Sequence, residues 1–148
     1  DFVRPAAGGE KDTMALFAVT CGQGVRELSE KWKAEGDYLN SHLLQALALE
    51  MAEATAEYLH KRIRTSWGIV DDQTLTRKQL FNAEYQGIRV SFGYPACPNL
   101  DDQKKLFGLL KPEQIGIQLT EGDMMDPEAS ISALVFHHPQ GKYFDVSR

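Results

Sequence analysis

The stretch from Asp37 to Trp67 constrains the fold most strongly, because it has the pattern of one long amphipathic helix. Its apolar residues recur at steps of three and four, which places them on one helix face. These residues are Leu44, Leu47, Met51, Tyr58, Leu59 and Ile63. Asp37 near the start and Arg64 near the end suit the helix dipole, and Gly68 favours termination. A helix of this kind needs another layer of structure to cover its apolar face.

A second set of side chains follows the same steps on another face of this helix. Its members are Glu50, Glu53, Glu57, Lys61 and Arg64. A glutamate followed four residues later by a lysine forms a favourable pair, so an ion pair is expected between Glu57 and Lys61. The three glutamates form a row of carboxylates that is typical of a solvated face but also suits contact with a partner. The sequence leaves these two interpretations open.

The rest of the chain predicts shorter elements of both kinds. Helices are expected over 25–34, 76–84 and 101–110, and strands over 14–20, 115–120, 130–138 and 142–146. Residues 85–98 contain glycines and prolines without a sustained period, which indicates an irregular hydrophobic loop. Helices early in the chain and a strand pair late favour an α+β fold over repeating βαβ units.

Composition narrows the class of protein. A chain of 148 residues, 43% of them hydrophobic, suffices for one compact domain. The net charge of −5 disfavours nucleic-acid binding, because a duplex-binding protein needs a cationic surface. No apolar run approaches the ~20 residues that span a bilayer, so no membrane contact is expected. Cys21 and Cys97 form no CxxC pair, which is typical of reduced thiols in a cytoplasmic protein.

The histidines and cysteines lack the spacing of metal ligands. Structural or solvent-exposed roles are therefore expected for all four histidines, which are His42, His60, His137 and His138. Cys97 has no basic neighbour in the sequence that would stabilise a thiolate, so nucleophilic catalysis by this residue is only weakly supported. The sequence therefore assigns no catalytic residue and no metal ligand.

The segment from Arg89 to Pro98 has the most unusual composition in the chain. Gly93 lets the backbone approach a ligand without a Cβ clash, and Tyr94 offers a flat face for stacking. The planar guanidinium of Arg89 matches a carboxylate or a phosphate. Together these residues suit a small ligand that carries a carboxylate and an aromatic ring. An ordinary proline-rich corner with a surface arginine would have the same composition, so the residues alone leave both interpretations open.

The string R-x-x-x-G-Y-P-A-C-P at 89–98 resembles the S-adenosylmethionine site in the C-terminal reactivation domain of cobalamin-dependent methionine synthases. The lead-in YQGIR belongs to the same pattern. Counterparts of three further segments occur in the same order, at 52–64, 119–132 and 137–144. The resemblance thus covers nearly the whole chain.

The resemblance implies a C-shaped α+β domain with a twisted antiparallel sheet. It implies one domain of a larger methyltransferase that binds S-adenosylmethionine and positions its methyl group for reductive methylation of cob(II)alamin, which restores methylcobalamin. The implied partners are the cobalamin-binding domain of the same polypeptide and a flavodoxin-type electron donor. The resemblance implies zinc only in a different domain of the full enzyme. On this basis residues 1–148 are expected to form the activation domain without its N-terminal portion and its final helical segment.

Site residues follow from the resemblance position by position. Arg89 is expected to pair with the methionine carboxylate of the ligand. The positions expected to shape the groove are Gly93, Tyr94, Pro95 and Ala96. Tyr143 and Phe144 are expected to contact the ligand mainly through their backbone. Glu53, on the long helix, is expected to face the cobalamin domain.

The sequence departs from the family pattern at three places. Residues 90–92 read Val-Ser-Phe where many relatives have Pro-Ala-Pro, and this departure keeps a docking function open. Ala83 stands where an acidic residue with a water-mediated ligand contact is common, and residues 99–102 replace a commoner histidine-containing string. One alternative is a non-catalytic docking module for a cobalamin or flavoprotein partner. Another is a stand-alone methyltransferase that acts on a different acceptor.

Overall fold

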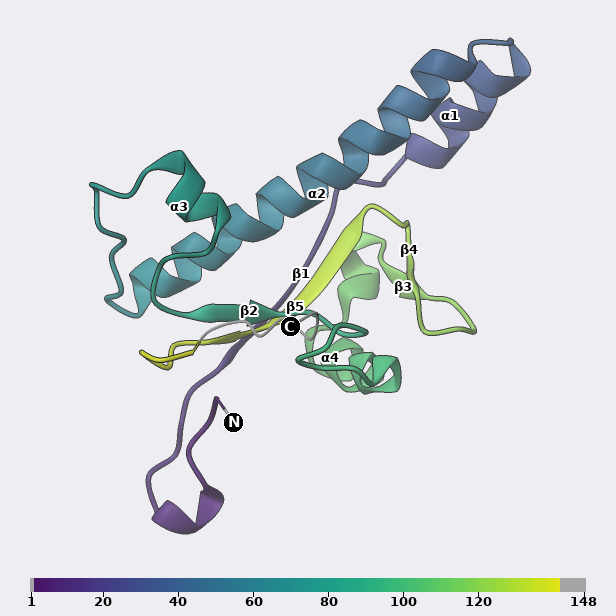
Figure 1. Ribbon diagram of the computed structural model, residues 1–148. Helices are drawn as coiled ribbons and strands as arrows, with labels where there is room; N and C mark the ends of the chain where they lie inside the picture. Colours follow the sequence, from purple (N-terminus) through teal and green to yellow (C-terminus); the bar gives the residue numbers. More distant parts are fainter. Residues whose placement is uncertain (1, 142–148) are drawn as a thin grey trace.

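The computed structural model describes residues 2–141, which form a three-stranded sheet with helices on both faces (Figure 1). The strands are β1 (Ala15–Thr20), β2 (Ile88–Val90) and β5 (Ser130–Phe136). Their order is β1-β5-β2, and both pairings are antiparallel. The α+β prediction is therefore confirmed, with a long helix beside an antiparallel sheet.

The long helix α2 (Tyr38–Ser66) has the predicted length. The side chain of Asp37 accepts a hydrogen bond from the backbone N–H of Asn40, and Gly68 follows the helix with a positive φ of 80°. The helix α1 (Val25–Ala34) also lies where the sequence predicts it and packs along the N-terminal half of α2. Figure 1 shows that this pair of helices extends beyond the sheet as an arm.

The face of α2 that packs on the sheet differs from the prediction. Leu47, Met51 and Tyr58 are exposed, although Leu44, Leu59 and Ile63 are partly buried as expected. The buried stripe instead recurs every four residues and consists of Ala48, Ala52, Ala56, His60 and Arg64. Alanine has no side chain beyond Cβ, so it lets the helix backbone lie close to the strands. The larger apolar residues are consequently left on the outer faces of the helix.

Alternating side chains of the sheet face two hydrophobic clusters. Phe17, Ala133 and Val135 pack with Ala56 on the α2 side. The alternate positions Leu16 and Leu134 face the opposite side, where a second cluster is formed by Phe92, Leu106, Phe107 and Ile117. The central strand β5 is therefore covered on both faces, which explains its nearly continuous burial.

The remaining elements are short. They are η1 (Ala6–Gly8), α3 (Arg77–Phe81), η2 (Leu100–Asp102), α4 (Gln103–Leu110), η3 (Pro112–Ile115), β3 (Gln118–Leu119) and β4 (Met125–Asp126). The helix predicted over 76–84 begins at a capping box of Thr76 and Gln79 but ends earlier, because Ala83 has a positive φ of 53°. The strand predicted over 115–120 is reduced to β3, because the preceding residues form a 3₁₀ turn.

The segment 85–98 is not wholly irregular, which corrects the prediction of a loop. Ile88–Val90 forms the edge strand β2, with Arg89 opposite Val135 of β5. Two glycines around this strand obscure its period in the sequence, since both Gly87 and Gly93 have positive φ angles.

None of the helices in the described part of the chain combines the length and apolar character needed to cross a membrane.

Candidate functional site

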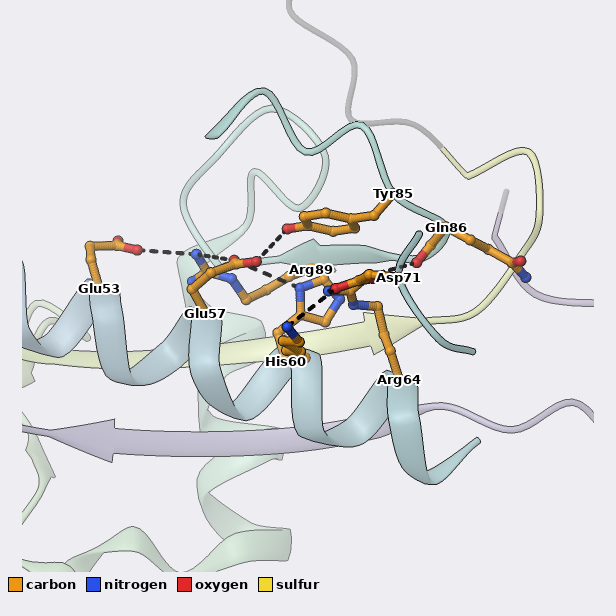
Figure 2. Close-up of polar contacts among 9 residues, drawn as sticks. Glu53, Glu57, His60, Arg64, Asp71, Tyr85, Gln86 and Arg89 are labelled. Carbon is orange, nitrogen blue, oxygen red and sulfur yellow. Dashed lines mark hydrogen bonds and ion pairs between the residues drawn. The ribbon is translucent and has the colours of Figure 1, made fainter. Parts of the chain in front are cut away.

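An open groove of about 1410 Å³ lies between the C-terminal half of α2, the segment from α3 to β2, and the turn after β2. Figure 2 shows that acidic and basic side chains from these elements meet in it. The groove brings together Glu53, Arg89 and Tyr94, three of the residues that the sequence singled out. It also contains Glu57 and Tyr85, for which the sequence predicted no part in a ligand site.

Arg89 enters the groove because of the alternation along β2. Ile88 and Val90 are buried on the face of the sheet opposite α2. Because side chains alternate along a strand, Arg89 between them points toward α2. Its Nη2 donates to the Glu53 carboxylate at 3.1 Å and lies 3.8 Å from Glu57 Oε2. The side chain of Arg89 remains 19% exposed. The guanidinium is therefore partly held by α2 and partly open to the groove.

Glu57 is the more constrained of the two glutamates beside Arg89. The hydroxyl of Tyr85 donates a hydrogen bond to Glu57 Oε1 at 2.6 Å, and Nδ1 of His60 lies 3.9 Å from Oε2. Burial raises the pKa of Glu57, but the neighbouring His60, Tyr85 and Arg89 side chains outweigh it and bring the pKa to about 2. The predicted ion pair with Lys61 is wrong, because Lys61 lies 4.0 Å from Asp71 instead.

Arg64 forms a buried ionic cluster at the inner end of the groove. Its guanidinium contacts Asp71 through both Nη atoms and stacks on the ring of Tyr85, with Cζ 3.7 Å from the ring centroid. A Cβ at Gly87 would approach Arg64 Cδ to 3.0 Å, so this position favours glycine. Arg64 is therefore buried, unlike the glutamates with which the sequence pattern groups it.

Buried His60 lies in the same cluster. Neither of its ring nitrogens has a hydrogen-bond partner within the part of the chain that the structure describes. Its ring meets the Tyr85 ring edge-on at 5.6 Å. Across residues 2–141, no group of three or more histidine, cysteine, aspartate or glutamate side chains is arranged to hold a metal ion.

The turn after β2 presents Tyr94 to solvent. Cys97 N–H donates to the Tyr94 carbonyl at 2.8 Å and Gly93 N–H to the Cys97 carbonyl at 2.9 Å, which closes the turn around Pro95 and Ala96. Tyr94 is 60% exposed at the edge of the groove. Burial and the nearby Asp102 raise the pKa of the Cys97 thiol, which disfavours the thiolate.

Two residues of the predicted site, Tyr143 and Phe144, lie outside the described residues, as does the strand predicted over 142–146. The sequence missed the cluster around Tyr85, whose only signal is the run of four-residue steps that continues from Ala56 to His60 and Arg64. Extending the four-residue steps from Ala56 predicts that the side chains of His60 and Arg64 point toward the protein interior.

The chain matches known proteins over its whole length. The family model for the vitamin B12 dependent methionine synthase activation domain matches residues 1–148. Methionine synthases of Mycobacterium tuberculosis and Mycobacterium leprae are 36% and 33% identical over 99% of the chain, which spans 13% of each of these relatives. The crystal structure of the MetH reactivation domain bound to AdoHcy has a TM-score of 0.90 and 40% identity, covering 99% of this chain and 46% of that one. The chain therefore belongs to the family of vitamin B12 dependent methionine synthase activation domains.

Proposed function

We propose that this chain binds S-adenosylmethionine in the groove beside Arg89 and holds its methyl group for the reactivation of a cobalamin carried by a neighbouring domain. The observation that carries the proposal is the partly open guanidinium of Arg89, which lies on β2 beside the exposed ring of Tyr94. The similar MetH reactivation domain was crystallised with AdoHcy, which shares the adenosyl and amino-acid parts of the proposed ligand.

The groove fits the proposed ligand in charge and size. A guanidinium binds a carboxylate through two parallel hydrogen bonds, and a tyrosine ring stacks on a nucleobase. The groove volume of about 1410 Å³ exceeds what an adenosyl amino acid requires. We assign the carboxylate to Arg89 and the wall of the groove to the turn Gly93, Tyr94, Pro95 and Ala96, with Tyr143 and Phe144 completing it through their backbone.

The chemical role of this chain is orientation. The sulfonium of S-adenosylmethionine makes its methyl group electrophilic, so no protein nucleophile is required. Holding the methyl group in line with an acceptor gives a large rate advantage over free diffusion. In the proposed reaction, one methyl group and one electron convert cob(II)alamin into methylcobalamin, and the ligand leaves as S-adenosylhomocysteine.

The partners follow from the same proposal. We assign cobalamin to a neighbouring domain of the same polypeptide, zinc to a different domain, and the electron to a flavodoxin-type donor. Glu53 lies on an exposed part of α2 and is assigned to the surface that meets the cobalamin domain. The whole enzyme would act as a methyltransferase, with this chain as one of its domains.

Isothermal titration with AdoHcy tests the proposal. Arg89→Ala is expected to weaken binding about 10- to 100-fold, because it removes a charge-assisted pair of hydrogen bonds. Arg89→Lys is expected to restore only part of the affinity, because an ammonium group lacks the planar fork. Arg77→Ala is the matched control, since Arg77 is exposed on α3 outside the groove. Unchanged affinity in Arg89→Ala would refute the assignment, and no binding by the unaltered protein would favour the docking module.

A further inference from the structure

We propose that ligand binding at Arg89 exchanges one carboxylate for another. In the structure Arg89 lies between Glu53 and Glu57. Glu57 stays in place as a positioning residue, whereas Glu53 leaves when the carboxylate of the ligand arrives. This inference rests on the proposed function, because it requires a ligand carboxylate to bind Arg89.

The two glutamates share one cation. They are four residues apart on α2, so both project from the same side of the helix. Like charges at this spacing repel each other, and the repulsion is relieved where a cation lies between them. Nη2 of Arg89 takes that place, at 3.1 Å from Glu53 Oε2 and 3.8 Å from Glu57 Oε2 (Figure 2).

Glu57 is held independently of Arg89. The Tyr85 hydroxyl donates to its Oε1 at 2.6 Å, and the Tyr85 ring is itself fixed against the buried Arg64. Moving Glu57 away would leave the Tyr85 hydroxyl without its acceptor in a partly buried position, which is costly. The carboxylate of Glu57 therefore stays beside the Arg89 guanidinium, with its Oε2 3.8 Å from Nη2.

Glu53 is held far less firmly. Its side chain is 61% exposed, against 44% for Glu57, and its carboxylate accepts a hydrogen bond from Arg89. Water replaces the contacts of such a carboxylate at little cost. A third carboxylate arriving at the same guanidinium would therefore displace Glu53 and leave Glu57 in place.

The exchange gives the two glutamates opposite effects on binding. Glu53 competes with the ligand for Arg89, so its removal strengthens binding. Glu57 orients Arg89 for the ligand, so its removal weakens binding. Glu30 is exposed on α1 outside the groove, which makes it a control for the change in charge.

Isothermal titration of the protein at its natural length tests this proposal with two probes. AdoHcy carries the amino-acid carboxylate, whereas 5′-methylthioadenosine lacks the whole amino-acid part. E53Q is expected to bind AdoHcy about two- to fivefold more tightly, the range of one exposed ion pair, and 5′-methylthioadenosine unchanged. E57Q is expected to bind AdoHcy more weakly, and E30Q to match the unaltered protein with both probes.

Thermal unfolding of each variant checks that it is folded. Tyr85→Phe offers a second way to release Glu57, because it removes the hydroxyl that holds the carboxylate and keeps the ring that stacks on Arg64. Weaker or equal AdoHcy binding by E53Q would overturn the exchange, as would an equal gain for both probes. Unchanged AdoHcy affinity in E57Q and Tyr85→Phe would overturn the positioning role of Glu57. If the unaltered protein did not bind AdoHcy, the proposed function itself would fail, and the inference with it.

Discussion

Arg64 and Arg89 belong to the same groove and both face acidic side chains, yet they differ in burial. The side chain of Arg64 is 1% exposed, and its contacts with Asp71 and the Tyr85 ring enclose it. The side chain of Arg89 is 19% exposed, and its nearest carboxylate belongs to the exposed Glu53. The number of fixed partners, rather than the residue type, separates a structural arginine from one that is available to a ligand.

The strongest test of this comparison is Arg64→Met. Breaking this buried ion pair removes the hydrogen-bonded cation of Asp71 and leaves only Lys61 nearby, at 4.0 Å, so the free energy of unfolding is expected to fall by about 3–5 kcal/mol. Urea denaturation measures this loss. Arg62→Met is the control, because Arg62 is exposed on α2 and its loss is expected to stay within about 0.5 kcal/mol. Equal losses in the two variants would contradict a structural role for Arg64.

The alanine stripe that brings Arg64 inward offers a second test. Ala52 is buried where α2 packs on the start of β5, so Ala52→Leu is expected to cost about 1–3 kcal/mol through overpacking. Ala46 is exposed on the same helix, and Ala46→Leu is expected to leave stability nearly unchanged. If chemical denaturation gave the same stability for both variants, the close contact between helix and sheet would be refuted.

The third test separates the stacking of Tyr85 from its hydrogen bond. Tyr85→Phe keeps the ring on Arg64 but removes the donor to Glu57, so a loss of about 0.5–1.5 kcal/mol is expected. Tyr58→Phe is the matched control, because the Tyr58 hydroxyl lies at an exposed contact with Arg62. A loss no larger than that of the control would mean that the bond to Glu57 contributes nothing measurable.

The smallest effect is a pH dependence from Glu57. Its pKa is about 2 in the folded protein, against an ordinary 4.5, so folding favours the ionised carboxylate. This contribution is fully present above about pH 4.5 and is lost as the pH falls toward about 2. Because the side chain is 44% exposed, solvent screening keeps the effect below about 1 kcal/mol. Denaturation of the wild type and E57Q across this range should show their difference shrinking at acidic pH, and a constant difference would contradict the assignment.

Much of the fold was predictable because its signals are local. The bounds of α1 and α2 follow from helix periodicity, Asp37 and Gly68, and the strand β1 follows from a short apolar run. The edge strand β2 was missed because only three residues separate the irregular turns around it, which is too short for a period to be read. The pairing of β2 with β5 is a contact between distant segments, and no local pattern shows it.

The candidate site divides in the same way. The motif at 89–98 identified Arg89 and Tyr94, which the structure places in one groove. The partners of Arg89 were not predictable. The row that contains Glu53 and Glu57 is compatible with a solvated face and with a partner surface, and no local pattern shows that the edge strand brings a cation against it. The buried stripe was misassigned because hydrophobicity favoured Leu47 and Met51 over alanine, whereas packing on a sheet favours the smaller side chain.

The most direct test of the central claim is a crystal structure of the protein with AdoHcy, in which the distance from the ligand carboxylate to each arginine is measured. We expect the carboxylate within hydrogen-bonding distance of the Arg89 guanidinium, with Arg64 still paired to Asp71 and Tyr85. A ligand carboxylate placed away from Arg89, or on Arg64 in place of Asp71, would contradict the role proposed for Arg89.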